Sequence, residues 1–428
     1  MRLAVVGSGI SGMTAAWLLS RDHEVDVLEA EDRLGGHTHT IDVELDGQTL
    51  AADTGFMVFN HRTYPNLVRL FEHLGIEEQD ADMSFSVQHR ADGVEWKGDA
   101  GGLFAQPGNA LRPAFWGMLR DVLRLSRAAD RLLADPATEE LTLGELLARE
   151  RYGRAFLDWY LVPMGAAIWS TPAGRMLDFP AGTFLRFCDN HGLLHVTGKP
   201  QWKSVPGGAR RYTHALAGRV SGRVRTGARV VCVQRFDDRV EVRLDNGEAL
   251  GYDGVVLACH TDDALGFLAD PSEDEVAVLS AVPYQPNDVV LHSDASLLPT
   301  HRRAWAAWNY VSDGHGDAPV AVHYQLNVLQ GHDVPSRLLV SLNSVRPPAA
   351  EHVIERFSAA HPQFTGEGIA AQRRVPSLQG VRRTWYAGAW QRHGFHEDGC
   401  ISGLRVAEGF GIAPPWGRIL DPERDGAR

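Results

Sequence analysis

The sequence predicts an α/β protein built on a Rossmann-like parallel sheet, and three observations predict this fold class. The chain begins with a short apolar run, Arg2–Val6, followed by a glycine-rich turn over 7–12 and an apolar helical stretch that ends at Leu19. A second apolar run, Glu24–Leu28, comes directly afterwards. Near the other end of the chain, Thr384–Gly388 forms a further apolar run. Strand, glycine turn, helix and strand in this order are typical of the first unit of a parallel sheet.

The spacing of the first glycines predicts a dinucleotide site. Gly7 permits the tight turn, Gly9 lets the backbone approach a pyrophosphate, and Gly12 lets the helix pack closely on the strand. The helix N-terminus would offer unpaired N–H groups and the positive end of its dipole to phosphates. Glu29, at the end of the second strand, is placed to accept hydrogen bonds from a ribose. A glycine-rich turn that binds no nucleotide is the alternative interpretation of the same pattern.

The segment Arg33-Leu34-Gly35-Gly36 favours FAD over NAD. NAD sites do not need a second glycine pair after the acid. In FAD enzymes of the glutathione-reductase and amine-oxidase types, this pair lets the backbone pass close to the phosphate and the ribityl chain. We therefore expect a glutathione-reductase-type FAD domain.

Composition limits the class of protein. With 428 residues, the chain exceeds the usual size of one core, so two domains are expected. A formal net charge of −12 argues against nucleic acid as a partner. The four cysteines are far apart and form no CxxC pair, which predicts a reduced, cytoplasmic protein with no disulfide and no metal site. The glycine turn argues against a cleaved signal peptide, and no apolar stretch reaches the roughly 18 residues of a membrane span.

The expected FAD domain is discontinuous. We assign residues 1–75, 200–275 and 376–428 to it, because strand patterns recur at 223–233, 239–244 and 254–258 and near the C-terminus. The C-terminal part is expected to contain a polar loop over 393–399 and a helix over 402–409.

The remaining segments predict an α+β substrate domain. Residues 76–199 form a mainly helical insert, and residues 276–375 form a mainly antiparallel sheet. Within the second segment we expect strands at 318–326 and 337–345 and a helix at 351–360.

The chain resembles the flavin amine oxidase superfamily, which includes protoporphyrinogen oxidases, phytoene desaturases and fatty-acid isomerases. Further motifs resemble a bacterial subgroup of FAD-dependent oxidoreductases that are often encoded beside cyclopropane-fatty-acyl synthases. These motifs are Asp53–Phe56, Asn60–Asn66, Pro163–Ser170, Pro206–Gly208 and Phe395–Gly399. The resemblance covers nearly the whole chain and implies an acyl lipid as substrate.

The resemblance also implies which residues hold the cofactor. The ADP half would be held near the two glycine segments, by Gly7, Ser8, Gly9, Ser11, Gly12, Glu29, Ala30, Arg33, Gly35, Gly36, His37 and Thr38. Val230 and Val231 would offer backbone groups to the adenine, and Gly388, His396, Glu397 and Asp398 would surround the ribityl chain and the pyrimidine edge of the flavin. The helix expected from Ser402 would direct its positive end at the flavin.

Departures from the family pattern weigh against simple amine oxidation. Ala389 stands where the family usually has an acid, and His37 stands where many members have arginine. The strand region 284–292 lacks the lysine that amine oxidases place near the flavin. No cysteine precedes the C-terminal strand at the place used for covalent attachment, so we expect non-covalent FAD.

The catalytic residues stay open at this point. His37 and His39 are candidates for proton movement, with hydrogen bonds to backbone or phosphate as the alternative. Phe395 would form an aromatic wall beside the flavin, and Trp169 is a candidate for the substrate pocket. Four further aromatic residues line either the pocket or the core, namely Trp305, Trp308, Tyr310 and Tyr324.

One predicted helix, Pro113–Ala134, carries a basic stripe made of Arg120, Arg124, Arg127 and Arg131. A solvated face interleaved with Asp121 and Asp130 is the favoured interpretation. An interfacial helix on anionic lipid is the alternative.

The predicted function is hydride transfer from a hydrophobic substrate, an unsaturated or modified fatty acyl chain, to flavin N5. Three alternatives are an amine oxidase, a flavin-dependent isomerase and a flavin-binding partner of a lipid-modifying enzyme that does no chemistry. The expected partners are a small apolar or lipid substrate and, in the alternative given above, the inner surface of a membrane. The oligomeric state stays open.

Overall fold

The computed structural model describes residues 1–169, 173–194, 198–314 and 321–425. Its first sheet has five parallel strands in the order β10-β2-β1-β14-β20, which confirms the Rossmann-like prediction. The five strands are β1 (Arg2–Val6), β2 (Glu24–Leu28), β10 (Val224–Arg225), β14 (Gly254–Leu257) and β20 (Thr384–Tyr386). They come from the start, the middle and the end of the chain, so this part of the fold is discontinuous, as expected.

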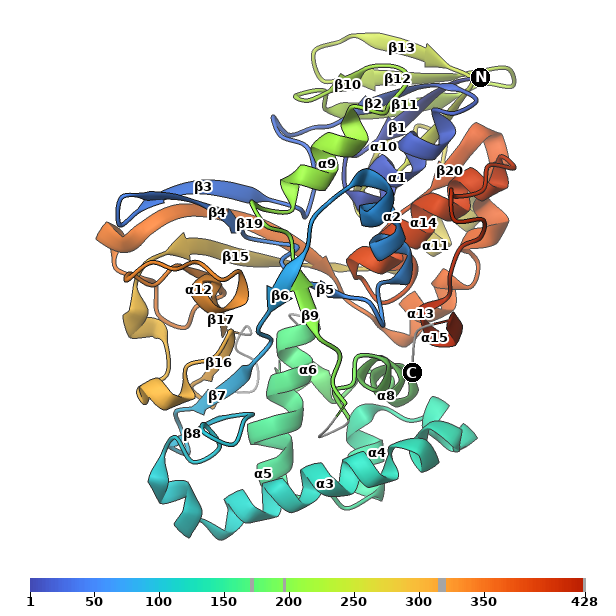
Figure 1. Ribbon diagram of the computed structural model, residues 1–428. Coiled ribbons are helices and arrows are strands. Elements are labelled where there is room, and N and C mark those ends of the chain that lie inside the picture. The colour runs from blue at the N-terminus through green and yellow to red at the C-terminus, as the bar shows by residue number, and fades with distance from the viewer. Residues whose placement is uncertain (170–172, 195–197, 315–320, 426–428) are drawn as a thin grey trace.

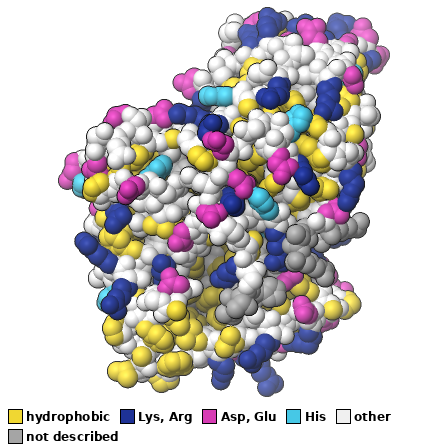
Figure 2. All heavy atoms as spheres, in the orientation of Figure 1, with side chains coloured by type: hydrophobic (Ala, Val, Ile, Leu, Met, Phe, Trp, Pro, Cys, Tyr) yellow, Lys and Arg dark blue, Asp and Glu magenta, His cyan; other side chains and the backbone are white. Residues whose placement is uncertain are grey.

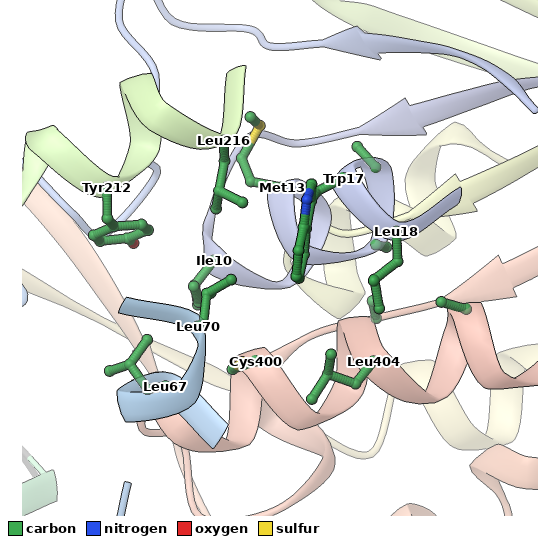
Figure 3. Packing of buried hydrophobic residues seen from close by; sticks show 14 of the residues in the cluster. Ile10, Met13, Trp17, Leu18, Leu67, Leu70, Tyr212, Leu216, Cys400 and Leu404 are labelled. Atoms are coloured by element: carbon green, nitrogen blue, oxygen red, sulfur yellow. The ribbon is translucent and has the colours of Figure 1, made fainter. Parts of the chain in front are cut away.

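Two helices, α1 (Ile10–Leu19) and α14 (His396–Gly409), cover one face of this sheet. All ten residues of α1 are buried, and α14 packs along it. In Figure 3, side chains of α1 such as Ile10 and Trp17 lie over Cys400 and Leu404 of α14. The two helices approach so closely that a Cβ on Gly403 would stand 2.4 Å from the Ser11 carbonyl oxygen, and only glycine fits there.

The start of α14 corrects the prediction of a loop over 393–399 and a helix from Ser402. The helix begins at His396, because the Asp398 carboxylate accepts hydrogen bonds from the backbone N–H groups of Phe395 and His393 and so caps the first turn. Gly399 suggested a loop, but it is a packing position: a Cβ there would lie 2.6 Å from Cγ2 of Ile10.

The second large sheet has seven strands in the order β19-β15-β18-β17-β16-β7-β8. Neighbouring strands are antiparallel except for the parallel pair β16–β7. The strands are β7 (Phe85–His89), β8 (Val94–Lys97), β15 (Tyr284–His292), β16 (Trp308–Ser312), β17 (Ala321–Gln325), β18 (Leu339–Leu342) and β19 (Val353–Pro362). This confirms a separate sheet-rich part with mostly antiparallel pairing.

The helix predicted over 351–360 is wrong. Only a 3₁₀ turn at Ala350–His352 is helical, and the rest of the segment is strand β19. Good helix formers such as Glu351 and Glu355 suggested the helix, but β19 pairs with β15 along its whole length. Tertiary pairing therefore overrides the local preference.

The helical insert lies at one end of the molecule, opposite the five-stranded sheet (Figure 1). Its longest member, α3, runs along the outer edge with the bounds expected for the basic helix, Pro113–Ala134. The other helices of the insert are α4 (Leu143–Arg149), α5 (Arg154–Phe156), the π-turn Leu157–Leu161, α6 (Val162–Trp169), α7 (Ala173–Met176) and α8 (Ala181–Asn190). The mainly helical character of this segment is confirmed for its described residues.

Three small sheets and several helices complete the fold. The small sheets contain β3 (Thr40–Leu45) with β4 (Gln48–Asp53); β5 (Phe59–Asn60) and β6 (Gln79–Ala81) on either side of β9 (Trp202–Ser204); and β11 (Val230–Arg235), β12 (Val240–Leu244) and β13 (Ala249–Tyr252). The remaining helices are α2 (Pro65–Leu74), α9 (Arg210–Ala217), α10 (Thr261–Phe267), α11 (Glu273–Leu279), α12 (Leu326–Leu329), α13 (Gly366–Gln372) and α15 (Pro422–Asp425). The domain boundaries stay predictions. Within the described ranges, no helix combines the length and apolarity needed to cross a bilayer.

Candidate active site

The first glycine turn is built as its spacing predicts. Gly7 has φ +102°, and a Cβ on it would lie 2.6 Å from the Ala258 carbonyl oxygen on the neighbouring strand. A Cβ on Gly12 would lie 2.0 Å from the Gly7 carbonyl oxygen. At Gly9, by contrast, the nearest atom to a Cβ would be the Gly35 carbonyl oxygen at 4.0 Å. Gly7 and Gly12 are therefore required by packing, whereas Gly9 leaves open space at the N-terminus of α1.

The second glycine pair lies against the first. Gly36 has φ +56°, and a Cβ on it would lie 3.1 Å from the Cα of Gly9. Arg33 holds this loop through its guanidinium, which donates to the carbonyl oxygens of Gly36 at 2.9 Å and Thr38 at 3.3 Å. The two segments that the sequence singled out separately thus form one surface.

Glu29 and Ser8 form a buried polar pair beneath this surface. The Glu29 carboxylate accepts from the backbone N–H of Ser8 at 2.9 Å and from its hydroxyl at 2.5 Å. The Ser8 hydroxyl oxygen in turn accepts from the backbone N–H of Gly35 at 3.0 Å. The acid at the end of β2 therefore fixes both glycine segments, a structural role that the sequence did not predict.

The N-terminus of α14 meets the same region through His396. Its Nε2 atom lies 2.9 Å from the Thr38 hydroxyl and 3.1 Å from the Tyr212 hydroxyl, and its ring stacks on Phe56 with centroids 3.7 Å apart. Burial and the nearby His37 keep the pKa of His396 well below its ordinary value, so the ring is neutral. The N-termini of α1 and α14 and the second glycine pair thus lie close together. Converging helix N-termini favour a group with negative charge.

The family model of the flavin containing amine oxidoreductases matches residues 10–293, more than half of the chain. The chain belongs to this family.

Known relatives agree with this assignment. The chain is 28% identical over 264 residues to AofH of Mycobacterium tuberculosis, named as a flavin-containing monoamine oxidase, with 58% of this chain and 54% of that protein covered. It is 25% identical over 266 residues to the flavin-containing amine oxidase A of Canis lupus familiaris, covering 58% and 47%. The matched part spans about half the length of these curated relatives.

Solved structures agree in fold. A conjugated-linoleic-acid-producing fatty acid isomerase from P. acnes superposes with a TM-score of 0.69 at 17% identity, covering 96% of this chain and 98% of that one. Putrescine oxidase bound to putrescine gives a TM-score of 0.68 at 16% identity, covering 96% and 99%. At these identities the likeness shows the fold alone.

FAD is the cofactor of this flavin-containing amine oxidoreductase, and the residues present fit it. The open space at Gly9, the glycine backbone beside it and the two helix N-termini suit a pyrophosphate and an electron-rich flavin edge. The role of each predicted contact residue, including Ser11 and Ala30, stays a proposal.

The carboxylates of Glu397 and Asp398 accept hydrogen bonds from N–H groups of the protein itself. Glu397 accepts hydrogen bonds from the backbone N–H groups of Asn66 and Leu67 and from the Asn66 side chain, at 2.6–3.0 Å, and so caps α2. Burial raises the pKa of Glu397 to about 7, against the effect of these hydrogen bonds. Asp398 caps its own helix, as described above. Both residues therefore position the N-terminus of α14, and any contact of theirs with the flavin would be through the backbone.

Val230 and Val231, which were predicted to lie beside the adenine, stand at a β-bulge in strand β11. Val230 pairs with Leu244 and Cys232 pairs with Arg243, so Val231 falls out of register. Its side chain is 44% exposed. Just before this strand, the backbone N–H of Ala228 donates to the Glu29 carbonyl oxygen at 2.7 Å. A bulge next to the acid at the end of β2 suits the expected backbone contact of Val230 and Val231.

Gly388 lies where β20 approaches α14. Its backbone N–H donates to the Ser402 hydroxyl at 2.9 Å. A Cβ on Gly388 would lie 2.2 Å from Cδ1 of Trp390. The residue thus links the C-terminal strand to the helix, and its expected contact with the ribityl chain stays a prediction.

The two candidate histidines lie on the loop that follows the second glycine pair. The ring of His37 meets that of His361 edge to face, with centroids 4.9 Å apart. The ring of His39 meets Phe357 in the same way at 4.8 Å. The Nδ1 atom of His39 is buried with no hydrogen-bond partner among the described residues. Both aromatic partners belong to β19, the segment for which the sequence predicted a helix.

Phe395 and Trp169 belong to one aromatic cluster. Phe395 stacks on Phe187 of α8 with centroids 4.8 Å apart, and Trp169 of α6 lies 4.7 Å from the same Phe187 ring. A small cavity at the N-terminus of α14 is lined by Phe395, Phe187 and His191, among others. The structure thus brings together two candidates that are more than two hundred positions apart in the sequence.

The seven-stranded sheet has one apolar face, which we define by a row of paired residues that crosses all seven strands. The row is Phe357, Val289, Leu342, Val322, Tyr310, Val87 and Trp96. Trp308 and Tyr324 lie on the same face in the next row and meet edge to face at 4.7 Å. Residues of this face pack in one cluster with Trp159, Ala166 and Ala167 of the helical insert.

Trp305 does not belong to the apolar face. Its indole N–H donates to the Pro299 carbonyl oxygen, and its ring lies beneath the guanidinium groups of Arg302 and Arg337. The pocket interpretation is therefore wrong for Trp305, whereas Trp308, Tyr310 and Tyr324 share one face.

Sequence reasoning missed three residues of the site: Phe56, Tyr212 and His361. Phe56 was within reach, because it ends the motif Asp53–Phe56 that carried part of the resemblance. Tyr212 had no signal, since it reaches His396 only through the packing of α9. His361 was hidden by the incorrect helix over 351–360.

Proposed function

We propose that this oxidoreductase removes a hydride from an apolar substrate, an unsaturated or modified fatty acyl chain. One observation carries the proposal: the apolar row across the seven-stranded sheet ends at Phe357, and Phe357 contacts His39 on the loop that follows the second glycine pair. An unbroken row of buried and partly buried apolar side chains therefore leads to the segment proposed to hold the cofactor. Apolar side chains beside the cofactor suit a hydrocarbon chain better than a polar amine.

Bound FAD supplies a hydride acceptor, flavin N5, in this chemistry. The substrate would lose a hydride from one carbon to the flavin and a proton from the neighbouring carbon to a base, for which His37 and His39 are the candidates. A C=C bond would form between the two carbons, and oxygen or another acceptor would take the two electrons from the reduced cofactor. The chain has to orient the substrate and exclude water. Phe395, Phe187 and Trp169 suit the second task, because they form an aromatic cluster beside the N-terminus of α14.

Strand β15, which lies next to the edge strand β19 in the apolar face, supports the distinction from amine oxidation. β15 contains no lysine, and its polar members pair with protein groups. Asn287 is buried and donates to the carbonyl oxygens of Gln285 and Ala359, while Asp288 pairs with Arg356. The strand thus offers no ammonium group to the site.

For the cofactor, we propose non-covalent binding through the backbone of the two glycine segments and the loop at His37 and Thr38. The other proposed contacts with FAD are the bulge at Val230 and Val231 and the end of strand β20 at Gly388. The expectation of a cytoplasmic protein and the link to cyclopropane-fatty-acyl synthases stay predictions.

The test is anaerobic mixing of the purified holoenzyme with unsaturated acyl lipids, methylated acyl lipids and a panel of amines. Loss of the oxidised flavin absorbance with the acyl lipids, and a product with one more C=C bond, are the expected results. Reduction by amines alone would overturn the proposal in favour of amine oxidation. A rearranged product formed without any electron acceptor would replace it with isomerisation, and no spectral response to any compound would favour a non-catalytic role.

A further inference from the structure

The N-terminal half of α3 and the turn before it carry the two most exposed large apolar side chains of the described residues. Leu111 is 88% exposed and Trp116 is 52% exposed, while Leu123, two turns further along, is 45% exposed. Figure 2 shows hydrophobic side chains gathered in the lower left, over the end of the molecule where Figure 1 places the start of α3. A soluble surface rarely concentrates large apolar groups in this way without a partner.

Arginines alternate with the apolar side chains along the same helix face. Trp116, Arg120, Leu123 and Arg127 follow one another at spacings of four, three and four, so they project within a narrow arc of the helix. The Arg120 side chain is 73% exposed, and Arg127 is exposed and forms no ion pair within the described part of the chain.

The only acid between positions 105 and 129 is turned inward. The Asp121 side chain is 2% exposed, and its carboxylate accepts from the Gly153 backbone N–H at 2.8 Å and from Arg124 at 2.7 Å. The interleaved, solvated face favoured from the sequence is therefore wrong for Asp121, whereas Asp130 is exposed as that interpretation expects. In a chain of net charge −12, the exposed charge from Arg112 to Arg127 is positive, and the exposed Asp130 follows one turn later.

Trp116 is fixed in position. Its indole N–H donates to the Ala110 carbonyl oxygen at 2.9 Å, and its ring lies 5.6 Å from that of Phe104. The opposite face of the helix is well packed, with Phe115, Met118 and Leu125 buried. The exposed side chains therefore project from a rigid, anchored helix.

We propose that this surface, formed by Leu111, Trp116, Arg120, Leu123 and Arg127, docks the protein on an anionic lipid bilayer. Trp and Leu insert at the level of the headgroups, while the arginines bind lipid phosphates and carry their aliphatic stems along the apolar surface. A second copy of the chain fits less well, because a symmetric contact would set these arginines against one another. The surface belongs to the helical insert, whose α6 packs on the apolar face of the seven-stranded sheet.

The experiment is co-sedimentation of the holoenzyme with vesicles of phosphatidylcholine, with and without phosphatidylglycerol. We expect binding to the anionic vesicles, weaker binding to phosphatidylcholine alone, and release at high salt. The double variant Arg120→Gln, Arg127→Gln should lower the partition coefficient about 30-fold on anionic vesicles. The double variant Leu111→Ser, Trp116→Ser should lose binding to both vesicle types.

The matched control is the double variant Val276→Ser, Val345→Ser, which removes apolar side chains that are 42% and 41% exposed elsewhere on the surface. It should bind vesicles as the wild type does. Equal binding by all variants would overturn the proposal. A vesicle-free dimer that the Leu111→Ser, Trp116→Ser substitutions dissociate would overturn it too, in favour of a self-interface. The flavin spectrum of each variant reports whether the fold is intact, and vesicle binding is measured without any substrate.

Discussion

The Glu397 carboxylate and Asn66 are 331 positions apart, yet Glu397 accepts two hydrogen bonds from Asn66, one from its backbone N–H at 3.0 Å and one from its side-chain amide at 2.6 Å. A third N–H, that of Leu67, donates to the other carboxylate oxygen at 2.9 Å. One buried side chain at the start of α14 thus caps α2. This contact joins the two ends of the chain where the cofactor segments meet.

Replacing Glu397 by Gln should therefore destabilise the protein. The amide of Gln has one acceptor oxygen in place of two, so at least one buried N–H loses its partner, which costs about 1–3 kcal/mol. Urea denaturation of the apoprotein measures the free energy of unfolding. Glu408→Gln, an exposed position on the same helix, should change this free energy by less than about 0.5 kcal/mol. Equal stability of the two variants would contradict the capping role.

The glycine turn allows a separation of folding from cofactor binding. Gly9→Ala places a Cβ in open space, so the apoprotein should stay folded while the affinity for FAD falls about tenfold or more, because the methyl group occupies the expected approach of the pyrophosphate. Gly12→Ala forces a Cβ to within 2.0 Å of the Gly7 carbonyl oxygen and should lower both stability and affinity. Calorimetric titration with FAD and denaturation of the apoprotein provide the two readouts. A Gly9→Ala protein with the wild-type affinity would place the pyrophosphate elsewhere.

Two buried histidines share one serine in the seven-stranded sheet. The Asp294 backbone N–H donates to Nδ1 of His292, so Nε2 of His292 carries the proton and donates to the Ser341 hydroxyl at 2.6 Å. The Ser341 hydroxyl then donates to Nδ1 of His323 at 2.6 Å. Burial lowers the pKa of His292 to about 4 and that of His323 to about 3.

Stability should consequently fall on acidification. Histidine in the unfolded chain titrates near pH 6.5, above both folded pKa values, so the unfolded state takes up protons first. Between pH 7 and pH 5, each buried histidine should lower the free energy of unfolding of the protein by about 2 kcal/mol. Denaturation at several pH values gives the slope of the free energy of unfolding against pH. This slope should be smaller for His323→Gln and unchanged for His352→Gln, an exposed position. If His323→Gln left this slope unchanged, the pKa of His323 would be the same in the folded and unfolded states, which would contradict the effect of its burial.

Phe395→Leu tests the aromatic cluster. The substitution keeps an apolar side chain but removes the stacking on Phe187, so FAD affinity should change less than about threefold while flavin reduction by an acyl substrate slows about ten- to a hundredfold. Anaerobic stopped-flow absorbance measures the reduction. Phe236→Leu, at a position that is 39% exposed, is the matched control. An unaltered reduction rate would remove Phe395 from the substrate site.

The sequence by itself determined the parallel sheet and the cofactor. Gly7, Gly12 and the pair at Gly35 and Gly36 are local signals, because each reflects a backbone conformation or a close approach that only glycine permits. Such signals need no knowledge of distant partners. The same holds for the bounds of α3, which follow from the periodicity of its apolar residues.

The tertiary structure alone decided the surroundings of the cofactor segments. β19 is a strand because β15 offers it a partner, and this pairing brings Phe357 to His39 and His361 to His37. Likewise, Asp121 turned out to be buried by the contact with Gly153, which leaves the exposed charges of α3 positive up to Arg127, before the exposed Asp130. These features depend on pairing and packing between distant segments, and a local pattern carries no information about such partners.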